Sequence, residues 1–226
     1  MTNVATTDAG EHQRRVPVNR AQVVRSAVEL ADVYGLEALT MRRLGQALGV
    51  DPMAIYRHVR NKDDLLDVVV EAIVGEIEAP PPGRDWKESL RAQALSARAV
   101  MLRHPWARRA VQDRAATGAW IIAYVDAVLG TLRGAGFSVD LAHHALHVLG
   151  SRIFGFNQDV IDDSGPPPPP SAAAAMTRLL AGYPHAAELA REISHGGVLG
   201  PCDDDFEFAF GLELILDGLD RVRTTS

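Results

Sequence analysis

A basic and aromatic cluster near the N-terminus is the feature of this sequence that best predicts a chemical role. Within residues 56–62 the chain carries Tyr56, Arg57, His58, Arg60 and Lys62. Lysine, arginine and tyrosine side chains contact phosphate oxygens in protein–DNA complexes, and an arginine can bind guanine through two hydrogen bonds. The chemistry that this cluster favours is therefore the recognition of DNA.

Three histidines form a second group that could do chemistry. His143, His144 and His147 fall on one expected helix, and the spacing of His143 and His147 could place two imidazoles around a metal ion. Because no carboxylate accompanies them in the pattern of a metalloprotease helix, a helical surface or a pocket wall is the favoured interpretation. An all-α metal-dependent enzyme that uses these histidines is kept as a remote alternative. We otherwise expect no enzyme, no metal and no cofactor.

Two other features have simple structural explanations. The aspartates from Asp203 to Asp205 would stabilise the N-terminus of a helix without any cation. Cys202 is the single cysteine of the chain, and it lacks a recognisable nucleophile motif. One cysteine also excludes an internal disulfide framework and fits a reducing compartment.

The elements that must position the basic cluster begin with a long helix. Apolar residues at spacings of three and four predict a helix over Arg20–Tyr34. Asn19 is a suitable N-cap, and Gly35 ends the helix as a C-cap glycine would. Residues 1–17 are polar and irregular, and we expect a disordered tail in which Arg14 and Arg15 could reach a minor groove.

Two shorter helices follow and form a helix-turn-helix pattern. Thr40 caps a helix over Met41–Leu48, and Gly49 supplies the positive φ that a sharp turn requires. Asp51 caps the third helix, and Pro52 fits its first turn. The basic cluster then lies on and just after this third helix, where a short helix would enter a DNA major groove.

The rest of the chain is predicted to be helical, so the fold class is all-α. Asn61 caps a fourth helix that runs to about Glu78, and the PPPG sequence of residues 80–83 breaks it. The later helices are expected over Trp86–Arg103, Gly118–Arg133, Val139–Gln158 with Ser138 as its cap, Ala172–Leu180, Pro184–Ser194 and about Asp204–Arg223. Gly118–Arg133 is apolar around much of its surface and is expected to be buried. The five prolines of residues 166–170 predict an extended spacer.

Charge is divided unevenly along the chain. Residues 1–62 contain nine Lys and Arg against six Asp and Glu, a balance of +3, whereas the remainder contains 14 against 23, a balance of −9. A basic head on an acidic body is expected if only the head meets phosphates. The sequence has no run of 18 apolar residues and no visible secretory signal, so we expect a cytoplasmic protein without a membrane span.

Two motifs resemble the DNA-binding domain of the tetracycline-repressor (TetR) family. They are LEALTMRRLGQALGVD (Leu36–Asp51) and IYRHVRNKDDLLD (Ile55–Asp67). The ending FEFAFGLELILDGLDRV (Phe206–Val222) is similar to the last helix of the tetracycline repressors proper, and with Ser138–Asp159 the resemblance extends over most of the chain.

The resemblance implies an all-α homodimer whose N-terminal helix-turn-helix domain is joined by helix four to a ligand-binding core. It implies a disordered tail (1–17), a DNA-binding domain (18–62), a connecting helix (63–79) and a ligand-binding and dimerisation domain (84–226) that includes a proline-rich spacer (162–171). In this family a small molecule bound in the core shifts helix four, changes the distance between the two reading heads and releases the operator.

The resemblance also implies which residues meet DNA. Arg42 matches a contact at the start of helix two, and Tyr56, His58 and Lys62 match phosphate contacts. Pro52, Met53, Ala54 and Arg57 occupy sequence-reading positions and differ from the residues of the tetracycline repressors, so a different operator is expected. The full expected DNA-binding set is Thr40, Arg42, Arg43, Pro52, Met53, Ala54, Tyr56, Arg57, His58 and Lys62.

The ligand pocket is predicted from large apolar residues of the central helices and from two histidines that could orient a ligand. These residues are Met101, His104, Trp106, Trp120, Tyr124, His147 and Phe154, with Phe156 as a further apolar candidate; each apolar residue could equally belong to an ordinary core. An approximate alignment places Met101 where tetracycline repressors have a metal-ligand histidine, so a magnesium–tetracycline ligand is not expected.

The dimer interface is predicted from the last helix, which is apolar on two faces and therefore needs two partners. One face carries Phe206, Phe210, Leu214 and Asp217, and Gly150 and Ile153 of the Val139–Gln158 helix could complete a four-helix bundle with a second copy.

The expected function is a ligand-responsive repressor, dimeric on a palindromic operator and released by a small-molecule inducer. Its partners are double-stranded DNA, a second copy of the chain and an unidentified inducer. An activator, or a regulator without a ligand, would have the same fold and stays open as an alternative.

Overall fold

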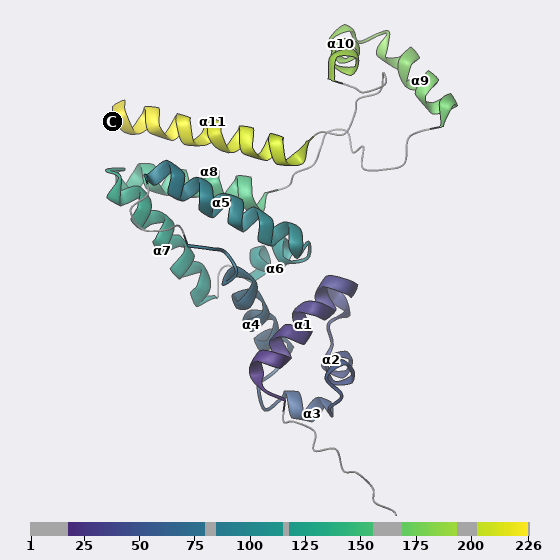
Figure 1. Cartoon of the computed structure of the whole chain (residues 1–226), viewed down its shortest axis with the longest axis vertical. Helices are drawn as coiled ribbons and strands as arrows, with labels where there is room; N and C mark the ends of the chain where they lie inside the picture. Colours follow the sequence, from purple (N-terminus) through teal and green to yellow (C-terminus); the bar gives the residue numbers. More distant parts are fainter. Residues whose placement is uncertain (1–17, 80–84, 115–117, 156–168, 194–202, 226) are drawn as a thin grey trace, which may run out of the picture. The chain divides into compact units, whose positions relative to one another are not determined.

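The computed structural model describes residues 18–79, 85–114, 118–155, 169–193 and 203–225, and it contains α-helices but no β-strand in these ranges (Figure 1). The all-α class predicted from the sequence is therefore confirmed. The elements are α1 (Arg20–Tyr34), the short 3₁₀ helix η1 (Leu36–Ala38), α2 (Met41–Leu48), α3 (Pro52–Ile55), α4 (Lys62–Val74), α5 (Trp86–Arg103), α6 (Ala107–Arg114), α7 (Ala119–Gly134), α8 (Val139–Phe154), α9 (Pro170–Leu180), α10 (Pro184–Ile193) and α11 (Asp204–Thr225).

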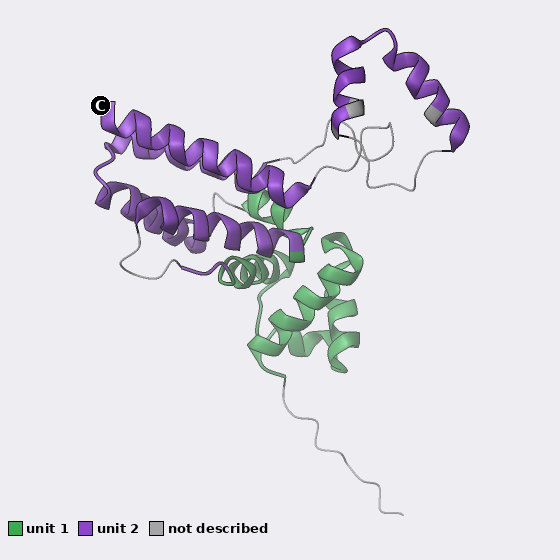
Figure 2. Cartoon of the chain, turned by 45° about the horizontal axis from the view of Figure 1, so that its top comes forward, with its two compact units in different colours: residues 1–76, 103–118 green, residues 77–102, 119–226 purple. Residues whose placement is uncertain are grey.

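The chain forms two compact units (Figure 2). Unit 1 consists of residues 1–76 and 103–118, and unit 2 consists of residues 77–102 and 119–226. Unit 1 therefore contains α6, although α6 follows α5 in the chain. The predicted tail with Arg14 and Arg15, most of the proline-rich spacer, Phe156 and Cys202 lie outside the described residues.

The helix starts of unit 1 follow the predicted caps. The Asn19 side chain accepts a hydrogen bond from the backbone N–H of Gln22, and the Gln22 side chain accepts one from the backbone N–H of Asn19, which makes a capping box. Thr40, Asp51 and Asn61 likewise cap α2, α3 and α4. Each cap satisfies a backbone N–H that has no partner inside its helix.

Several helix ends and two short elements differ from the sequence prediction. α4 ends at Val74 rather than near Glu78, because the chain turns at Gly75 and the backbone N–H of Glu78 donates to the Ser96 hydroxyl instead of to a helix carbonyl. α8 ends at Phe154, since Gly155 adopts an extended ψ of 167°. Pro170, predicted as part of an extended spacer, is the first residue of α9. The sequence did not predict η1 or α6, which are both short and therefore carry weak periodicity.

Unit 1 has a dense apolar core beneath the helix-turn-helix. The core joins residues of α1, α2, α3 and α4 that are at most 8% exposed, and Trp106 packs against it from the segment before α6. The fully buried members are Val23, Ala27, Leu39, Leu44, Ile55, Leu65 and Val69. This packing fixes the short α3, which at four residues could not be stable alone.

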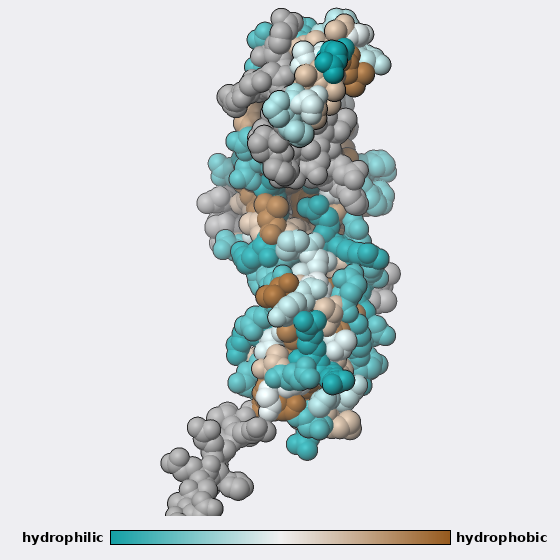
Figure 3. Space-filling model, turned by 90° about the vertical axis from the view of Figure 1, so that its right-hand side faces the viewer, coloured by the Kyte–Doolittle hydropathy of each residue, from teal (hydrophilic) through white to brown (hydrophobic). Residues whose placement is uncertain are grey.

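Unit 2 has a second apolar core built from α5, α7, α8 and α11. The prediction that the α7 segment is buried was wrong, because Val128 and Leu132 are its only buried residues and Ile122 is 71% exposed. On the face drawn in Figure 3, apolar side chains interrupt a largely hydrophilic surface. Among the described residues no single helix is long and apolar enough to cross a membrane, and only α6 and α7 taken together across a break have that length and composition.

Candidate nucleic-acid interface and ligand-binding core

The helix-turn-helix is held by a close crossing of α2 and α3. Gly45 is buried in α2, and a Cβ atom at this position would lie 2.9 Å from the Val50 carbonyl oxygen and 3.3 Å from the Pro52 nitrogen. A larger residue would therefore push the two helices apart. The sequence prediction missed Gly45, although a glycine within a helical pattern is itself a signal of close packing. Gly49, at φ 66°, makes the predicted turn.

The predicted reading residues of α3 point away from the core of unit 1. Ile55 is fully buried and anchors the helix, whereas Met53 is 69% exposed and Tyr56 is 43% exposed. Pro52 and Ala54 are half-buried, and Arg57 is exposed in the turn that follows α3 rather than in a helix. The arrangement leaves side chains of α3 available to an external surface while its apolar side is closed.

Several cationic side chains surround this surface. Some are exposed, and others already make a contact within the protein. Arg42 and Lys62 are exposed at the starts of α2 and α4. The guanidinium of Arg43 lies 3.9 Å from the centre of the Tyr34 ring, so a contact with DNA would compete with this cation–π contact. His58 is half-buried, and Thr40 is engaged as the cap of α2.

Arg60 is the member of the basic cluster that the structure pairs internally. Its side chain donates to Asp64 at 2.8 Å, and its backbone N–H donates to the other oxygen of the same carboxylate at 2.8 Å. These hydrogen bonds lower the pKa of the Asp64 carboxyl and raise that of Arg60. Because the Arg60 side chain is 85% exposed, this pair mainly stiffens the turn before α4.

α6 is attached to the start of α4. Arg114 pairs with Asp67, and it donates to the Asp63 carboxylate at 2.9 Å and to the Asp63 carbonyl oxygen at 3.1 Å. These contacts surround the first two turns of α4, beside Lys62. The position of α4 in unit 1 is thus determined by α6 as well as by the apolar core.

Two residues predicted to line the ligand pocket lie in unit 1 instead. His104 and Trp106 precede α6, and each places a ring nitrogen 2.7 Å from Oδ1 of Asp32 on α1. Trp106 also borders a surface cavity of about 400 Å³ with Lys62 and Arg109. The sequence prediction grouped these residues with the central helices, and the structure assigns them to unit 1, because the helical pattern of α5 does not reveal where the chain goes after Arg103.

The apolar interior of unit 2 encloses a small cavity between α5, α7 and α8. Its lining is Leu90, Gln93, Ala94, Tyr124, Val128, Leu146, Leu149, Gly150 and Ile153, and its volume is about 20 Å³. A cavity of this size holds a water molecule but no drug-sized ligand. Burial raises the pKa of the Tyr124 phenol to about 12, so the phenol stays neutral near pH 7 and can donate a hydrogen bond.

The remaining predicted pocket residues do not line this cavity. Phe154 packs edge-on against Tyr124 with ring centres 6.4 Å apart. Met101 is buried in α5 and Trp120 is half-buried in α7, and neither lines the cavity. His147 is exposed on α8.

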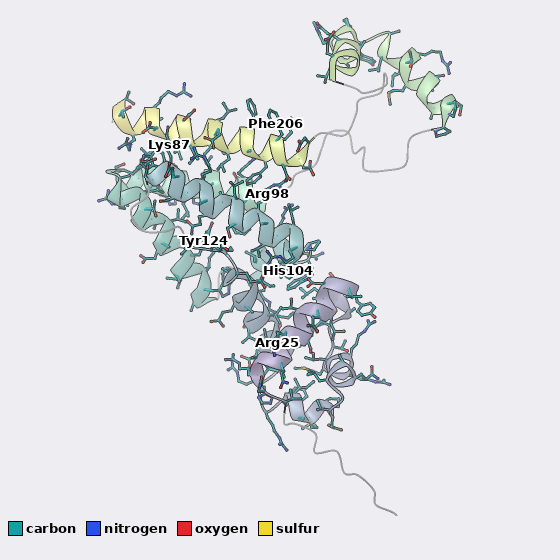
Figure 4. All side chains as sticks on the ribbon, viewed as in Figure 1. Arg25, Lys87, Arg98, His104, Tyr124 and Phe206 are labelled. Atoms are coloured by element: carbon teal, nitrogen blue, oxygen red, sulfur yellow. The ribbon has the colours of Figure 1, made fainter. Side chains whose placement is uncertain are left out.

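α11 exposes the apolar face on which the dimer prediction rests. Phe206, Phe210 and Leu214 are 61%, 53% and 55% exposed, and the two phenylalanine rings stack with centres 6.2 Å apart. Figure 4 labels Phe206 on α11. The opposite face contributes Phe208, Leu212, Leu216 and Leu219 to the core of unit 2. As predicted, the helix is apolar on two faces: one is buried in unit 2, and the other exposes Phe206, Phe210 and Leu214.

Ion pairs connect α11 with α5. Lys87 contacts Asp217 at 2.9 Å and Asp220 at 3.2 Å, and the two hydrogen bonds raise the pKa of Lys87. Asp217, predicted at the dimer interface, is thus already engaged within the protomer. Of the two α8 residues predicted at that interface, Gly150 lines the small cavity and has open space on its Cβ side, whereas Ile153 is buried in the core of unit 2.

No group of three or more metal-binding side chains occurs within the described residues. The rings of His143 and His147 are 4.6 Å apart, and those of His143 and His144 are 5.6 Å apart, all exposed on α8. Asp140 is the nearest carboxylate to His144, at 3.8 Å. These contacts make a solvated helix face.

Sequence comparisons match both parts of the chain to models of one family. Residues 23–69 match the model "Bacterial regulatory proteins, tetR family", and residues 79–223 match "Tetracyclin repressor-like, C-terminal domain". The chain is 30% identical to the HTH-type transcriptional repressor DrrR1 of Streptomyces coeruleorubidus, over 94% of this chain and 82% of that protein. It is 32% identical to the class C tetracycline repressor of Escherichia coli, over 92% and 94%.

Solved structures give the same result. ActR of Streptomyces coelicolor, in its ligand-free form, matches with a TM-score of 0.71 and 27% identity over 93% of this chain and 98% of that one. ActR in complex with actinorhodin matches with a TM-score of 0.69 and 27% identity over 92% and 99%.

Proposed function

This chain belongs to the TetR family of ligand-responsive, DNA-binding transcriptional repressors, and we propose that it binds a palindromic operator as a homodimer and leaves it when a small molecule binds unit 2. The observation that carries the proposal is the exposed surface of α2 and α3, where Met53, Tyr56 and Arg57 stand outward above a closed apolar core. A short helix presented in this way can enter a major groove.

Within this surface we assign different roles to different side chains. Lys62, Tyr56 and Arg42 would contact phosphates and set the register, because they are exposed at helix ends. Met53 and Arg57 would read base edges, the first through a thymine methyl group and the second through guanine. Pro52 and Ala54 are half-buried and would bring the backbone of α3 close to the bases. Arg43, His58 and Thr40 would complete the set.

We propose a second copy of this chain as the partner of the outer face of α11. Three large apolar side chains exposed along one helix are unusual on a monomer surface, and contiguous apolar patches mark interaction sites. A twofold axis would place the two heads on successive major grooves, about 34–36 Å apart, which requires a palindromic site.

The ligand proposal rests on the interior of unit 2. ActR, a relative of known structure, binds actinorhodin. In this chain Tyr124 supplies a neutral hydroxyl group and Gln93 a buried amide beside a cavity of about 20 Å³. An inducer must therefore enlarge this cavity, and it would select a conformation in which α5, α7 and α8 are further apart. An apolar aromatic molecule with one or two polar groups fits this lining.

An activator would use the same DNA surface, so only the effect on transcription distinguishes the two roles. The family members that match this chain are transcriptional regulators, and we propose no enzymatic activity for it. The cytoplasm, which contains bacterial DNA, is the proposed location.

The test is binding of the purified full chain to DNA fragments from around its own gene, measured at several salt concentrations. We expect tight binding to one palindromic site by two subunits or a multiple of two. Four to six phosphate contacts would give a slope of about −4 to −5 in a plot of log affinity against log salt. Weak binding to all fragments alike would contradict the operator proposal for these fragments, and no binding at low salt would contradict the DNA-binding assignment itself.

A further inference from the structure

One buried contact in unit 1 involves residues that belong neither to the predicted DNA-reading set nor to the lining of the unit 2 cavity. His104 is 4% exposed and occupies the connection between α5 and α6 (Figure 4). Its Nδ1 lies 2.7 Å from Oδ1 of Asp32, in the last turn of α1. The indole N–H of Trp106 donates to the same oxygen, also over 2.7 Å. Oδ1 of Asp32 on α1 is thus in hydrogen-bond contact with two ring nitrogens, both from the segment that follows α5.

The other side of the imidazole faces the end of α4. Nε2 of His104 lies 3.4 Å from Oε2 of Glu76, which directly follows the α4 cap Gly75, and Glu76 is paired with Arg103. Nε2 is buried and has no hydrogen-bond partner among the described residues. The segment from Arg103 to Trp106 therefore contacts α1 through Asp32 and the residue after α4 through Glu76.

The hydrogen bonds of His104 and Trp106 fix the geometry of this segment more closely than apolar packing alone would. A buried polar ring is unfavourable unless its nitrogens are bonded, so an aliphatic residue would be a simpler filler at position 104. Hydrogen bonds to a charged acceptor are also stronger and more directional than neutral ones. Trp106 packs against the core of unit 1, which fixes the direction of its N–H toward Asp32.

The chain connects this cluster directly to the proposed ligand site. Leu90, Gln93 and Ala94 of α5 line the cavity of unit 2, and α5 ends at Arg103, one residue before His104. A displacement of α5 along its axis would move His104 and Trp106, and their hydrogen bonds would carry that movement to Asp32. The family mechanism moves the head through helix four, and the contact with Asp32 adds a connection to α1.

We propose that Asp32, His104 and Trp106 form a latch that positions α1, and thereby the DNA-reading head, according to the position of α5. The inference rests on the proposed function, because it assigns these residues to positioning a head that reads DNA. They are positioning residues and need not touch DNA or ligand. With the latch intact, the head is held in one orientation; with the latch broken, the head keeps its fold but samples several.

The test compares variants that remove single hydrogen bonds. Trp106→Phe keeps an aromatic ring and removes the N–H. His104→Gln moves the donor toward the Nε2 position, whereas His104→Asn keeps an amide nitrogen near the Nδ1 position. Asp32→Ala removes the common acceptor. His144→Asn is the matched control, because His144 is exposed on α8 and outside the latch.

The first measurement uses the operator and copies of it whose half-sites are one base pair closer or further apart. A rigidly positioned head should discriminate between these spacings, so the wild type should bind the altered operators much more weakly. In Trp106→Phe, His104→Gln and Asp32→Ala this discrimination should fall about 3- to 10-fold, the effect expected for one or two lost hydrogen bonds. His104→Asn and His144→Asn should retain it.

Active-site titration with operator separates positioning from folding. A purely structural role would lower the fraction of active protein and leave the spacing preference of that fraction unchanged, and this result would overturn the latch. The double variant Asp32→Ala with Trp106→Phe should behave like Asp32→Ala alone, since both changes remove the same bond. Additive effects would also contradict the proposal.

A second measurement needs no operator. Amide hydrogen exchange of the full chain should be faster in the last turn of α1 in Trp106→Phe and Asp32→Ala, and unchanged in His144→Asn. If the wild type binds no operator but this exchange pattern is found, the proposed function fails while the contact that forms the latch stands. Unchanged exchange in all variants would overturn the latch whether or not an operator is found.

Discussion

The two units differ in what they leave exposed. In unit 1 the apolar side chains of the helix-turn-helix close on one another, and the cations Arg42, Arg57 and Lys62 are exposed around the DNA-reading surface. In unit 2 a helix that already contributes four residues to the core still exposes Phe206, Phe210 and Leu214.

This difference indicates what each unit binds. Exposed cations are well solvated and gain most from a polyanion that releases counterions, as DNA does. Exposed aromatic rings are poorly solvated and gain most from burial against another apolar surface. The cations of the DNA-reading surface therefore favour a polyanionic partner, whereas the exposed face of α11 favours an apolar one.

The largest expected effect comes from a charge placed on the apolar face of unit 2. Phe210→Glu should dissociate the dimer, because the change occurs twice in a symmetric interface and a central aromatic residue contributes about 2 kcal/mol or more at each position. That corresponds to roughly a thousand-fold rise in the dimer dissociation constant. Sedimentation equilibrium of the purified protein measures this constant, and operator binding should be lost with the dimer.

The matched control for this variant is Leu95→Glu. Leu95 is 44% exposed on α5 and receives the same acidic side chain. The control should remain dimeric and bind operator. A Phe210→Glu protein that stays dimeric at micromolar concentration would place the interface elsewhere. The exposed apolar face of α11 would then not be the dimer contact.

A smaller effect is expected from removing one exposed cation of unit 1. Lys62→Ala should weaken binding to every DNA sequence by a similar factor and reduce the salt slope by about 1, because one phosphate contact is lost. Fluorescence anisotropy with operator and with unrelated DNA, each over a salt series, gives both quantities.

Lys87→Ala is the lysine control, since Lys87 is paired with Asp217 and Asp220 in unit 2. Its salt slope should equal that of the wild type. An unchanged slope in Lys62→Ala would show that Lys62 does not contact phosphate and that the phosphate contacts proposed here need revision.

The parts of this fold that could be predicted from the sequence are those set by local interactions. Asn19, Thr40, Asp51 and Asn61 cap their helices because a short polar side chain reaches a backbone N–H two or three residues ahead, wherever the helix lies. Gly49 was predictable for the same reason, since its positive φ depends on the turn alone.

Tertiary partners could not be predicted in this way. The apolar pattern of α7 predicts a buried helix, but a pattern does not show how many neighbours are present, and only Val128 and Leu132 of α7 are buried. His104 has an ordinary position at the end of a helical pattern, and its burial depends on Asp32, 72 residues earlier in the chain. The contact with Asp32 could not be predicted, because spacing within one helix carries no information about α1.

The smallest expected effect tests the interior of unit 2. Burial raises the pKa of Tyr124 to about 12 in the folded protein, against an ordinary value near 10. Between these two pH values the unfolded chain loses the proton while the folded protein keeps it, so the stability contributed by the neutral phenol is complete below pH 10 and is lost as pH rises through 12. Tyr124→Phe should remove this loss.

The quantity to measure is the unfolding free energy of the wild type minus that of Tyr124→Phe. This difference should be about 1 kcal/mol lower at pH 11 than at pH 8. Urea unfolding at fixed protein concentration measures this difference, and groups that titrate in both proteins cancel. A difference that is the same at both pH values would mean that water reaches Tyr124, and that the core of unit 2 is already open to solvent before any ligand binds.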